Sequence, residues 1–167
     1  MKYIVFDIET TGLDTNNDSI TEIGAVLVEG GVVVDTFDEL INPGFGIPDF
    51  ITRINGIDDT MVSTADYPGV VLSRFHTFIK QGEFLVGHNA KRFDYPFIES
   101  EFNRNGIRFD GMPCKDTIWL ARSKVRNLRS YSLKALCTHF EIVNQTAHRA
   151  LSDVMATYEL FEELNRR

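Results

Sequence analysis

Acidic side chains in three well-separated segments of the chain could together bind divalent metal ions. Asp7 and Glu9 lie in the first segment, and Asp94 lies in the second. The third segment contains His148 and, five residues later, Asp153. Carboxylates gathered in one cleft repel each other, and Mg²⁺ relieves that repulsion because it takes hard oxygen ligands. Two such ions suit phosphodiester hydrolysis, with His148 as the general base that activates a water.

The first acidic pair is expected at the end of a buried strand. Residues 3–8 are largely apolar on both faces, as in a central strand. Residues two apart share a face, so Asp7 and Glu9 point the same way, toward the crevice where α/β sheets bind ligands. The turn that follows, Thr10, Thr11 and Gly12, lets backbone N–H groups approach a terminal nucleotide. A solvated strand end is the alternative interpretation of the pair.

The other acidic residues are expected near the beginnings of helices. Asp94 begins the helix predicted over residues 93–105, where the helix dipole alone would also favour an acid. His148 and Asp153 are separated by about 140° on a helical wheel, so they cannot share one helix face. We therefore predict His148 on the loop before the last helix and Asp153 within that helix. A histidine without a catalytic role is the alternative.

The hydrophobic pattern predicts an α/β domain with a mixed sheet. Two strands, over residues 19–28 and 32–41, flank a Gly-Gly turn and form a hairpin. Three antiparallel strands followed by alternating helices and strands indicate this class, although the pattern does not predict the strand order. Short strands are expected over residues 83–87 and 113–116, and helices over residues 67–80, 93–105, 117–119, 133–140 and 149–165.

Composition predicts one domain spanning residues 1–167, with enough apolar material (43%) for a single core. The net charge of −7 argues against wide electrostatic capture of a polyanion, which should be held locally, at the metals and by a few cations. Cys114 and Cys137 are interpreted as buried free thiols. The chain starts directly with a strand, and no apolar run approaches the roughly 20 residues of a membrane span. We therefore expect a cytoplasmic protein without a membrane partner.

These residues resemble the motifs of the DnaQ-like (DEDDh) 3′→5′ exonucleases, which include proofreading subunits of bacterial replicative polymerases. Residues 6–13 (Phe-Asp-Ile-Glu-Thr-Thr-Gly-Leu) match the first motif, and residues 148–153 match the third with its five-residue spacing. The resemblance covers residues 3–164 and implies a ribonuclease H-like mixed sheet, with three antiparallel strands, then parallel strands, flanked by helices. Further landmarks are residues 54–57, 116–117 and 132–137.

The resemblance implies roles for individual residues. Asp7, Glu9, Asp94 and Asp153 would bind two Mg²⁺, which Mn²⁺ could replace, and His148 would be the base. The chain departs from the family pattern by one extra residue between its second-motif His and Asp, and by an asparagine where many relatives carry a histidine. The residues expected to contact the terminal nucleotide are Thr10, Thr11, Gly12, Leu13, Asn55, His88, Asn89 and Phe93.

The expected activity is release of nucleoside 5′-monophosphates from single-stranded 3′ ends, with DNA favoured, as in proofreading or repair. Expected partners are single-stranded DNA or RNA ends, with a DNA polymerase subunit as a candidate. Two alternatives stay open: an RNA-trimming, oligoribonuclease-like enzyme, and a non-catalytic module that binds nucleic acid or a polymerase. The 2′-OH contacts that separate RNA from DNA cannot be located in the sequence.

A basic segment, residues 122–131, is a second candidate for substrate contacts. It carries four Lys or Arg side chains and ends at Tyr131, which could stack on a base. The hypothesis is that it follows the phosphates of a single strand. A solvated helix end with favourable cations is an equally good interpretation. Lys91 and Arg92, beside the expected metal site, are a further candidate phosphate contact.

Overall fold

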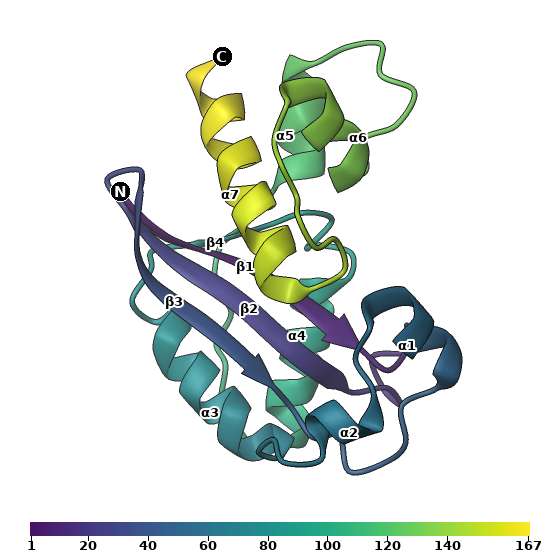
Figure 1. Cartoon of the computed structure of the whole chain (residues 1–167). Helices are drawn as coiled ribbons and strands as arrows, with labels where there is room; N and C mark the ends of the chain where they lie inside the picture. Colours follow the sequence, from purple (N-terminus) through teal and green to yellow (C-terminus); the bar gives the residue numbers. More distant parts are fainter.

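The computed structural model describes residues 1–167, and its centre is one five-stranded mixed sheet (Figure 1). The strand order is β3-β2-β1-β4-β5, with β1, β2 and β3 antiparallel and with β4 and β5 parallel to β1. The prediction of an α/β domain with a mixed sheet is confirmed. The strands are β1 (Lys2–Thr10), β2 (Ile20–Glu29), β3 (Val32–Leu40), β4 (Leu85–Gly87) and β5 (Cys114–Asp116).

Helices cover both faces of the sheet (Figure 1). One face carries α3 (Pro68–Ile79) and α4 (Asp94–Arg104). The other carries α7 (Ala150–Arg166), against which α5 (Thr117–Lys124) and α6 (Leu133–Phe140) pack. Two short helices, α1 (Asp49–Asn55) and α2 (Asp59–Val62), follow β3. No helix combines the length and the apolar character that crossing a bilayer requires.

The alternation of side chains along β1 decides which face the acidic pair occupies. Ile4 and Phe6 point into the core shared with α3 and α4. Tyr3 and Val5 point to the opposite face and pack with residues of α7. Since Asp7 and Glu9 continue the odd-numbered series, they belong to the face that α7 covers.

Local signals explain several helix boundaries. The Ser132 hydroxyl accepts a hydrogen bond from the backbone N–H of Ala135, at 3.2 Å, and so caps the start of α6. Asp58 caps α2 in the same way, through the N–H of Met61. Helices α1 and α2 were not predicted. They have a small apolar cluster of their own, formed by Ile47, Ile51, Ile57 and Val62.

Both cysteines are free, as expected. Cys137 is buried, but the prediction of a buried thiol is wrong for Cys114, which is only half-buried on the edge strand β5. The three-residue length of β5 and its position at the edge explain this partial exposure.

Candidate active site

Three of the predicted metal ligands converge at the carboxyl end of β1. Carboxylate oxygens of Asp7, Glu9 and Asp153 all lie within 4.8 Å of one another. The first two come from β1, and the third comes from the first turn of α7. The structure thus joins segments of the chain that are more than 140 residues apart.

A glycine allows α7 to come this close to the sheet. Gly24 on β2 lies opposite Asp7 in the β1–β2 register. A Cβ atom added to Gly24 would lie only 2.6 Å from backbone atoms of Ala150 and Leu151 at the start of α7. No larger residue fits without movement of that helix, so Gly24 sets the distance between α7 and the strands.

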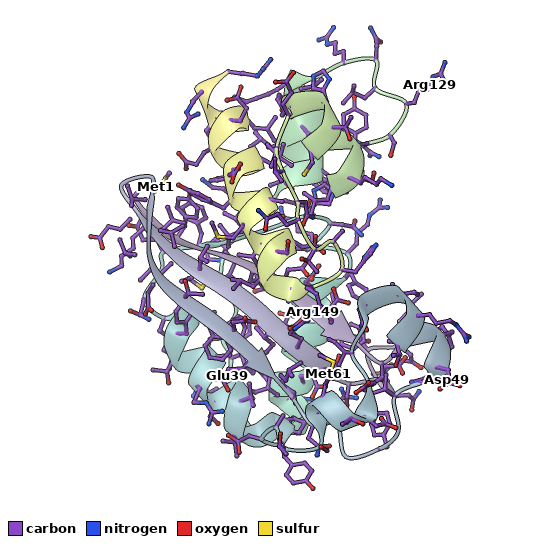
Figure 2. The ribbon with its side chains drawn as sticks, in the orientation of Figure 1. Met1, Glu39, Asp49, Met61, Arg129 and Arg149 are labelled. Carbon is purple, nitrogen blue, oxygen red and sulfur yellow. The ribbon has the colours of Figure 1, made fainter.

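A buried ion pair fixes the same helix end. Glu22 on β2 lies opposite Glu9 in the register and is 2% exposed. Arg149 donates from Nε to both carboxylate oxygens of Glu22, each at 3.1 Å. Its Nη2 also donates to one of these oxygens, at 2.6 Å. The N–H of Ala150 donates to the same carboxylate at 3.0 Å. Figure 2 shows Arg149 at the end of α7 that lies over the sheet.

Asp94, the fourth predicted ligand, lies at the start of α4 and is 4% exposed. Its carboxylate accepts a hydrogen bond of 3.2 Å from the backbone N–H of Ile8, between the two acidic residues of β1. Asp94 therefore borders the cluster, although only the other three carboxylates meet within 4.8 Å.

Burial and mutual repulsion shift the ionisation of these carboxyls. Burial, followed by the charges of Asp94, Asp153 and Glu9, raises the pKa of Asp7 well above its ordinary value. Burial raises the pKa of Glu9 to about 8, although the hydrogen bond from Asn55 opposes the shift. Burial likewise raises the pKa of Asp94 to about 7, against the Ile8 hydrogen bond. Burial is the largest cause of all three pKa shifts, and the charges of neighbouring carboxylates add to it.

His148 lies outside α7, on the preceding loop, as its spacing from Asp153 predicts. Its backbone is left-handed (φ 65°), and its side chain is exposed. Its backbone N–H donates to one carboxylate oxygen of Asp153 at 3.0 Å. Asn144 donates from its amide to the other oxygen at 2.5 Å, and the Asn144 amide oxygen accepts from Ser152 at 2.7 Å. The loop and Asp153 therefore hold each other in position.

The residues of the turn after β1 differ in exposure. Thr10 and Thr11 are buried, and their hydroxyls donate to Gly12 O and to the Asp18 carboxylate. Leu13, in contrast, is 81% exposed. The hydroxyls thus shape the turn, and Leu13 is the member whose side chain is free to meet a ligand.

Asn55 touches the cluster directly. Its amide nitrogen donates to the Glu9 carboxylate at 3.2 Å, and its amide oxygen accepts from the N–H of Ile57 at 3.0 Å. Asn55 therefore orients a predicted metal ligand. Phe93 lies just before α4, is half-buried and packs on Phe97, with ring centroids 5.1 Å apart.

His88 and Asn89 lie between β4 and α4 and make none of the hydrogen bonds to the acidic cluster. His88 Nδ1 is 2.8 Å from the Thr117 hydroxyl, and its buried Nε2 has no partner. Desolvation lowers the pKa of His88, which favours the neutral ring. Asn89 is left-handed (φ 60°), and its N–H donates to Asp116 at 3.2 Å. The extra residue of the second motif falls in this turn, which Phe93 closes by a hydrogen bond to Asn89 O.

Glu22, Gly24 and Asn144 support the site, and the sequence reasoning missed all three. A glutamate within the mostly apolar interior of a strand was the available signal for Glu22. No local pattern identifies Gly24 or Asn144, because both act through contacts with α7. Gly24 meets Ala150, more than 120 residues later, and Asn144 bonds Asp153, nine residues later.

The donor set fits a divalent cation. No ion pair joins Asp7, Glu9, Asp94 or Asp153 to a Lys or Arg side chain, although Asp94 is only 4% exposed. Buried carboxylates without a counter-charge are costly, and hard cations relieve that cost. The site therefore has the ligands and the unsatisfied negative charge that a metal centre requires.

Comparisons with known proteins agree with this arrangement. The family model described as "Exonuclease" (RNase_T) matches residues 4–161. DNA polymerase III of the PolC type from Caldanaerobacter subterraneus is 42% identical over 96% of this chain and 11% of the relative. The counterpart from Oceanobacillus iheyensis is 38% identical over 99% of this chain and 11% of the relative. The chain thus spans about a tenth of the length of these curated relatives.

Solved structures show the same fold. Escherichia coli exonuclease I, in a zinc-bound complex with single-stranded DNA, aligns with TM-score 0.87 at 20% identity, over 99% of this chain and 40% of that one. Exonuclease X, in complex with 5′-overhanging duplex DNA, aligns with TM-score 0.76 at 26% identity, over 98% and 91%. The fold is that of the ribonuclease H-like exonucleases. The chain belongs to the DnaQ-like 3′→5′ exonuclease family.

Proposed function

We propose that residues 1–167 form a single DEDDh-type exonuclease domain, which releases nucleoside 5′-monophosphates from the 3′ ends of single-stranded DNA. The observation that carries the proposal is the convergence of the Asp7, Glu9 and Asp153 oxygens within 4.8 Å. His148, whose backbone N–H donates to Asp153, would supply the proton acceptor.

Asp7, Glu9, Asp94 and Asp153 would hold two Mg²⁺, or Mn²⁺ in their place. Bound there, the ions supply positive charge that stabilises a leaving 3′ oxygen and lowers the pKa of a water. The exposed His148 ring would accept a proton from the attacking water. Asn55 keeps the Glu9 carboxylate in place, and Asn144 does the same for Asp153. Such outer hydrogen bonds orient ligands and tune their affinity.

The terminal nucleotide would lie against the turn after β1. Leu13 would wedge against the base, since it is the exposed member of that turn, and Phe93 would line the same pocket. Thr10, Thr11 and Gly12 would present backbone groups to the nucleotide. His88 and Asn89 would support the segment that leads to Asp94.

DNA is the favoured substrate for two reasons. The curated relatives are DNA polymerases, and the structure of exonuclease X, at 26% identity, is a complex with DNA. Proofreading or repair in the cytoplasm is the corresponding role. A DNA polymerase is a candidate partner, because in the relatives the matching segment is a tenth of a polymerase chain.

The test is digestion of 5′-labelled single strands of DNA and RNA with the same sequence, in Mg²⁺ and in EDTA. Wild-type protein should give a descending ladder, faster on DNA, and Asp7→Ala should abolish it. Faster digestion of RNA would replace the proposal with an exoribonuclease. A ladder that persists in Asp7→Ala, or no ladder in either Mg²⁺ or Mn²⁺, would refute the assignment.

A further inference from the structure

Half of the ten Lys and Arg residues that form no ion pair in this acidic protein lie in one short segment. Residues 117–140 contain five Lys or Arg residues and no acidic one, in a chain of net charge −7. All five are exposed and none forms an ion pair, whereas arginines elsewhere, such as Arg74, Arg104 and Arg149, are paired with carboxylates. A cationic surface without internal partners is available to an anionic ligand. The five residues are Arg122, Lys124, Arg126, Arg129 and Lys134.

Aromatic rings lie among these cations. Trp119, on the outer side of α5, is 58% exposed, and the ammonium of Lys91 lies 5.0 Å from its ring centroid. One turn further along α5, the guanidinium of Arg122 lies 5.4 Å from the ring centroid of Tyr131. Exposed rings beside cations are the combination that binds single strands, because bases stack while phosphates are neutralised.

The loop after α5 projects its arginines outward. Val125 is buried against α7, and its carbonyl accepts a 2.7 Å hydrogen bond from the Tyr131 hydroxyl. Arg126 and Arg129 lie between these anchors and are exposed. Figure 2 shows Arg129 at the far end of this loop, pointing away from the helices. The loop thus displays charge that no part of the domain uses.

This surface is continuous with the candidate active site. Strands β4 and β5 are parallel to β1, so α5 begins at the sheet edge where the acidic pair lies. Asp116 caps α5 through the N–H of Ile118 and also accepts from the N–H of Lys91 at 3.2 Å. Three residues after Lys91, the chain reaches Asp94. A strand leaving the site can therefore pass Lys91 and Trp119 first and the arginine loop next.

We propose that Lys91, Trp119, Arg122, Arg126 and Arg129, here called the α5 track, bind the single strand on the 5′ side of its terminal nucleotide. Trp119 stacks on a base, and the cations neutralise successive phosphates. The inference rests on the proposed function, because it assumes that the 3′ end lies at the acidic cluster. The track gives an acidic protein local hold on a polyanion.

Binding can be measured without cleavage. Trp119 is the only tryptophan of the chain, so its fluorescence reports directly on base stacking. An Asp7→Asn protein would be titrated with a single strand of about 12 nucleotides, a length within the usual site size. We expect quenching by this strand and none by polyglutamate of equal charge. Equal quenching by both would overturn the proposal in favour of an acidic protein partner, and no quenching by the strand would overturn it outright.

Salt dependence separates phosphate binding from general attraction. Replacing both Arg126 and Arg129 by Ala should reduce the slope of log Kd against log salt by about 0.7 for each phosphate that the variant no longer neutralises. Arg108→Ala is the matched control, since Arg108 is exposed, lies on the loop between α4 and β5 and pairs with Asp110. An unchanged slope in the double variant, or the same change in Arg108→Ala, would refute the track.

Turnover provides a second readout. In Trp119→Ala, the ratio of kcat/KM for the long strand to that for a dinucleotide should fall roughly tenfold, and Trp119→Phe should restore most of it. An unchanged ratio with active enzyme would refute the track and leave the nuclease assignment standing. If wild-type protein cleaves neither substrate, the proposed function fails, and the binding measurement still decides whether the surface holds a strand.

Discussion

A single methyl group at Gly24 should separate the carboxylates that we propose as metal ligands. Its Cβ would lie 2.6 Å from the backbone of Ala150 and Leu151, whereas ordinary van der Waals separation begins at 3.4 Å. The obstructing atoms are backbone, so no side chain can rotate away. The first turn of α7 must therefore retreat from β2 by roughly an ångström.

Asp153 would move with that turn, because its N–H is bonded to the carbonyl of Arg149. Overpacking of this kind costs about 1–3 kcal/mol of stability. Displacement of catalytic groups by an ångström can cost about 100-fold in rate. We expect Gly24→Ala to remain folded, to need more Mg²⁺ for half-maximal activity and to lose about 100-fold in kcat.

The assay is Mg²⁺-dependent release of mononucleotides from a labelled strand, with circular dichroism to confirm folding. Gly69→Ala is the matched control, because Gly69 lies in α3 and an added Cβ would meet only the Asn105 side chain, at 3.4 Å. Wild-type kcat and Mg²⁺ dependence in Gly24→Ala would refute the reasoning that close approach of α7 positions Asp153.

Three further predictions concern the same region. Arg149→Ala should lower the free energy of unfolding by about 2–3 kcal/mol in urea titrations, because it strips a buried carboxylate, Glu22, of its partner; a change under about half a kcal/mol would contradict this. Asn144→Ala should weaken Mg²⁺ binding about tenfold in calorimetry, because it frees the Asp153 carboxylate, and unchanged affinity would show that the hydrogen bond positions nothing. Without metal, the protein should lose stability as pH rises from about 5 to about 8. The pKa of Glu9 in the folded protein, about 8, exceeds its ordinary value of 4.5, so the folded state binds the proton more tightly than the unfolded chain. The stability that this proton contributes is full below about pH 4.5 and is lost as the pH rises through the folded pKa. Melting temperatures in EDTA should fall over that range, and Mg²⁺ should reverse the fall. Glu9→Gln should make the fall smaller without abolishing it, because the pKa values of Asp7 and Asp94 are also raised; an unchanged fall in this variant would contradict the assignment to Glu9.

The elements with strong periodicity could be predicted from the sequence. The helix expected over residues 67–80 is α3 (Pro68–Ile79), and the one expected over residues 149–165 is α7 (Ala150–Arg166). Helix α5 was expected only through Trp119, but it extends to Lys124. Its apolar pattern is too weak to predict where the helix ends. Helices α1 and α2 are too short for a periodic signal.

Some features of the candidate site could likewise be predicted from local sequence patterns, and others could not. The common face of Asp7 and Glu9 follows from the two-residue period of a strand, and the position of His148 outside the helix follows from its spacing to Asp153. The ion pair between Glu22 and Arg149 joins residues 127 apart. No local pattern encodes such a pairing, because it depends on which strand lies beside β1 and on where the final helix lands.

The origin of Asp153 in α7 has a consequence for the newly made chain. Three carboxylates of the cluster are present once residue 94 has been synthesised, but the fourth comes from the element that lies C-terminal to all others in the domain. Until that helix docks on β1 and β2, the ligand set is incomplete. Under the proposed chemistry, a chain that stops before residue 153, or one whose α7 has not yet docked, cannot degrade nucleic acid, and cleavage begins only once α7 is in place.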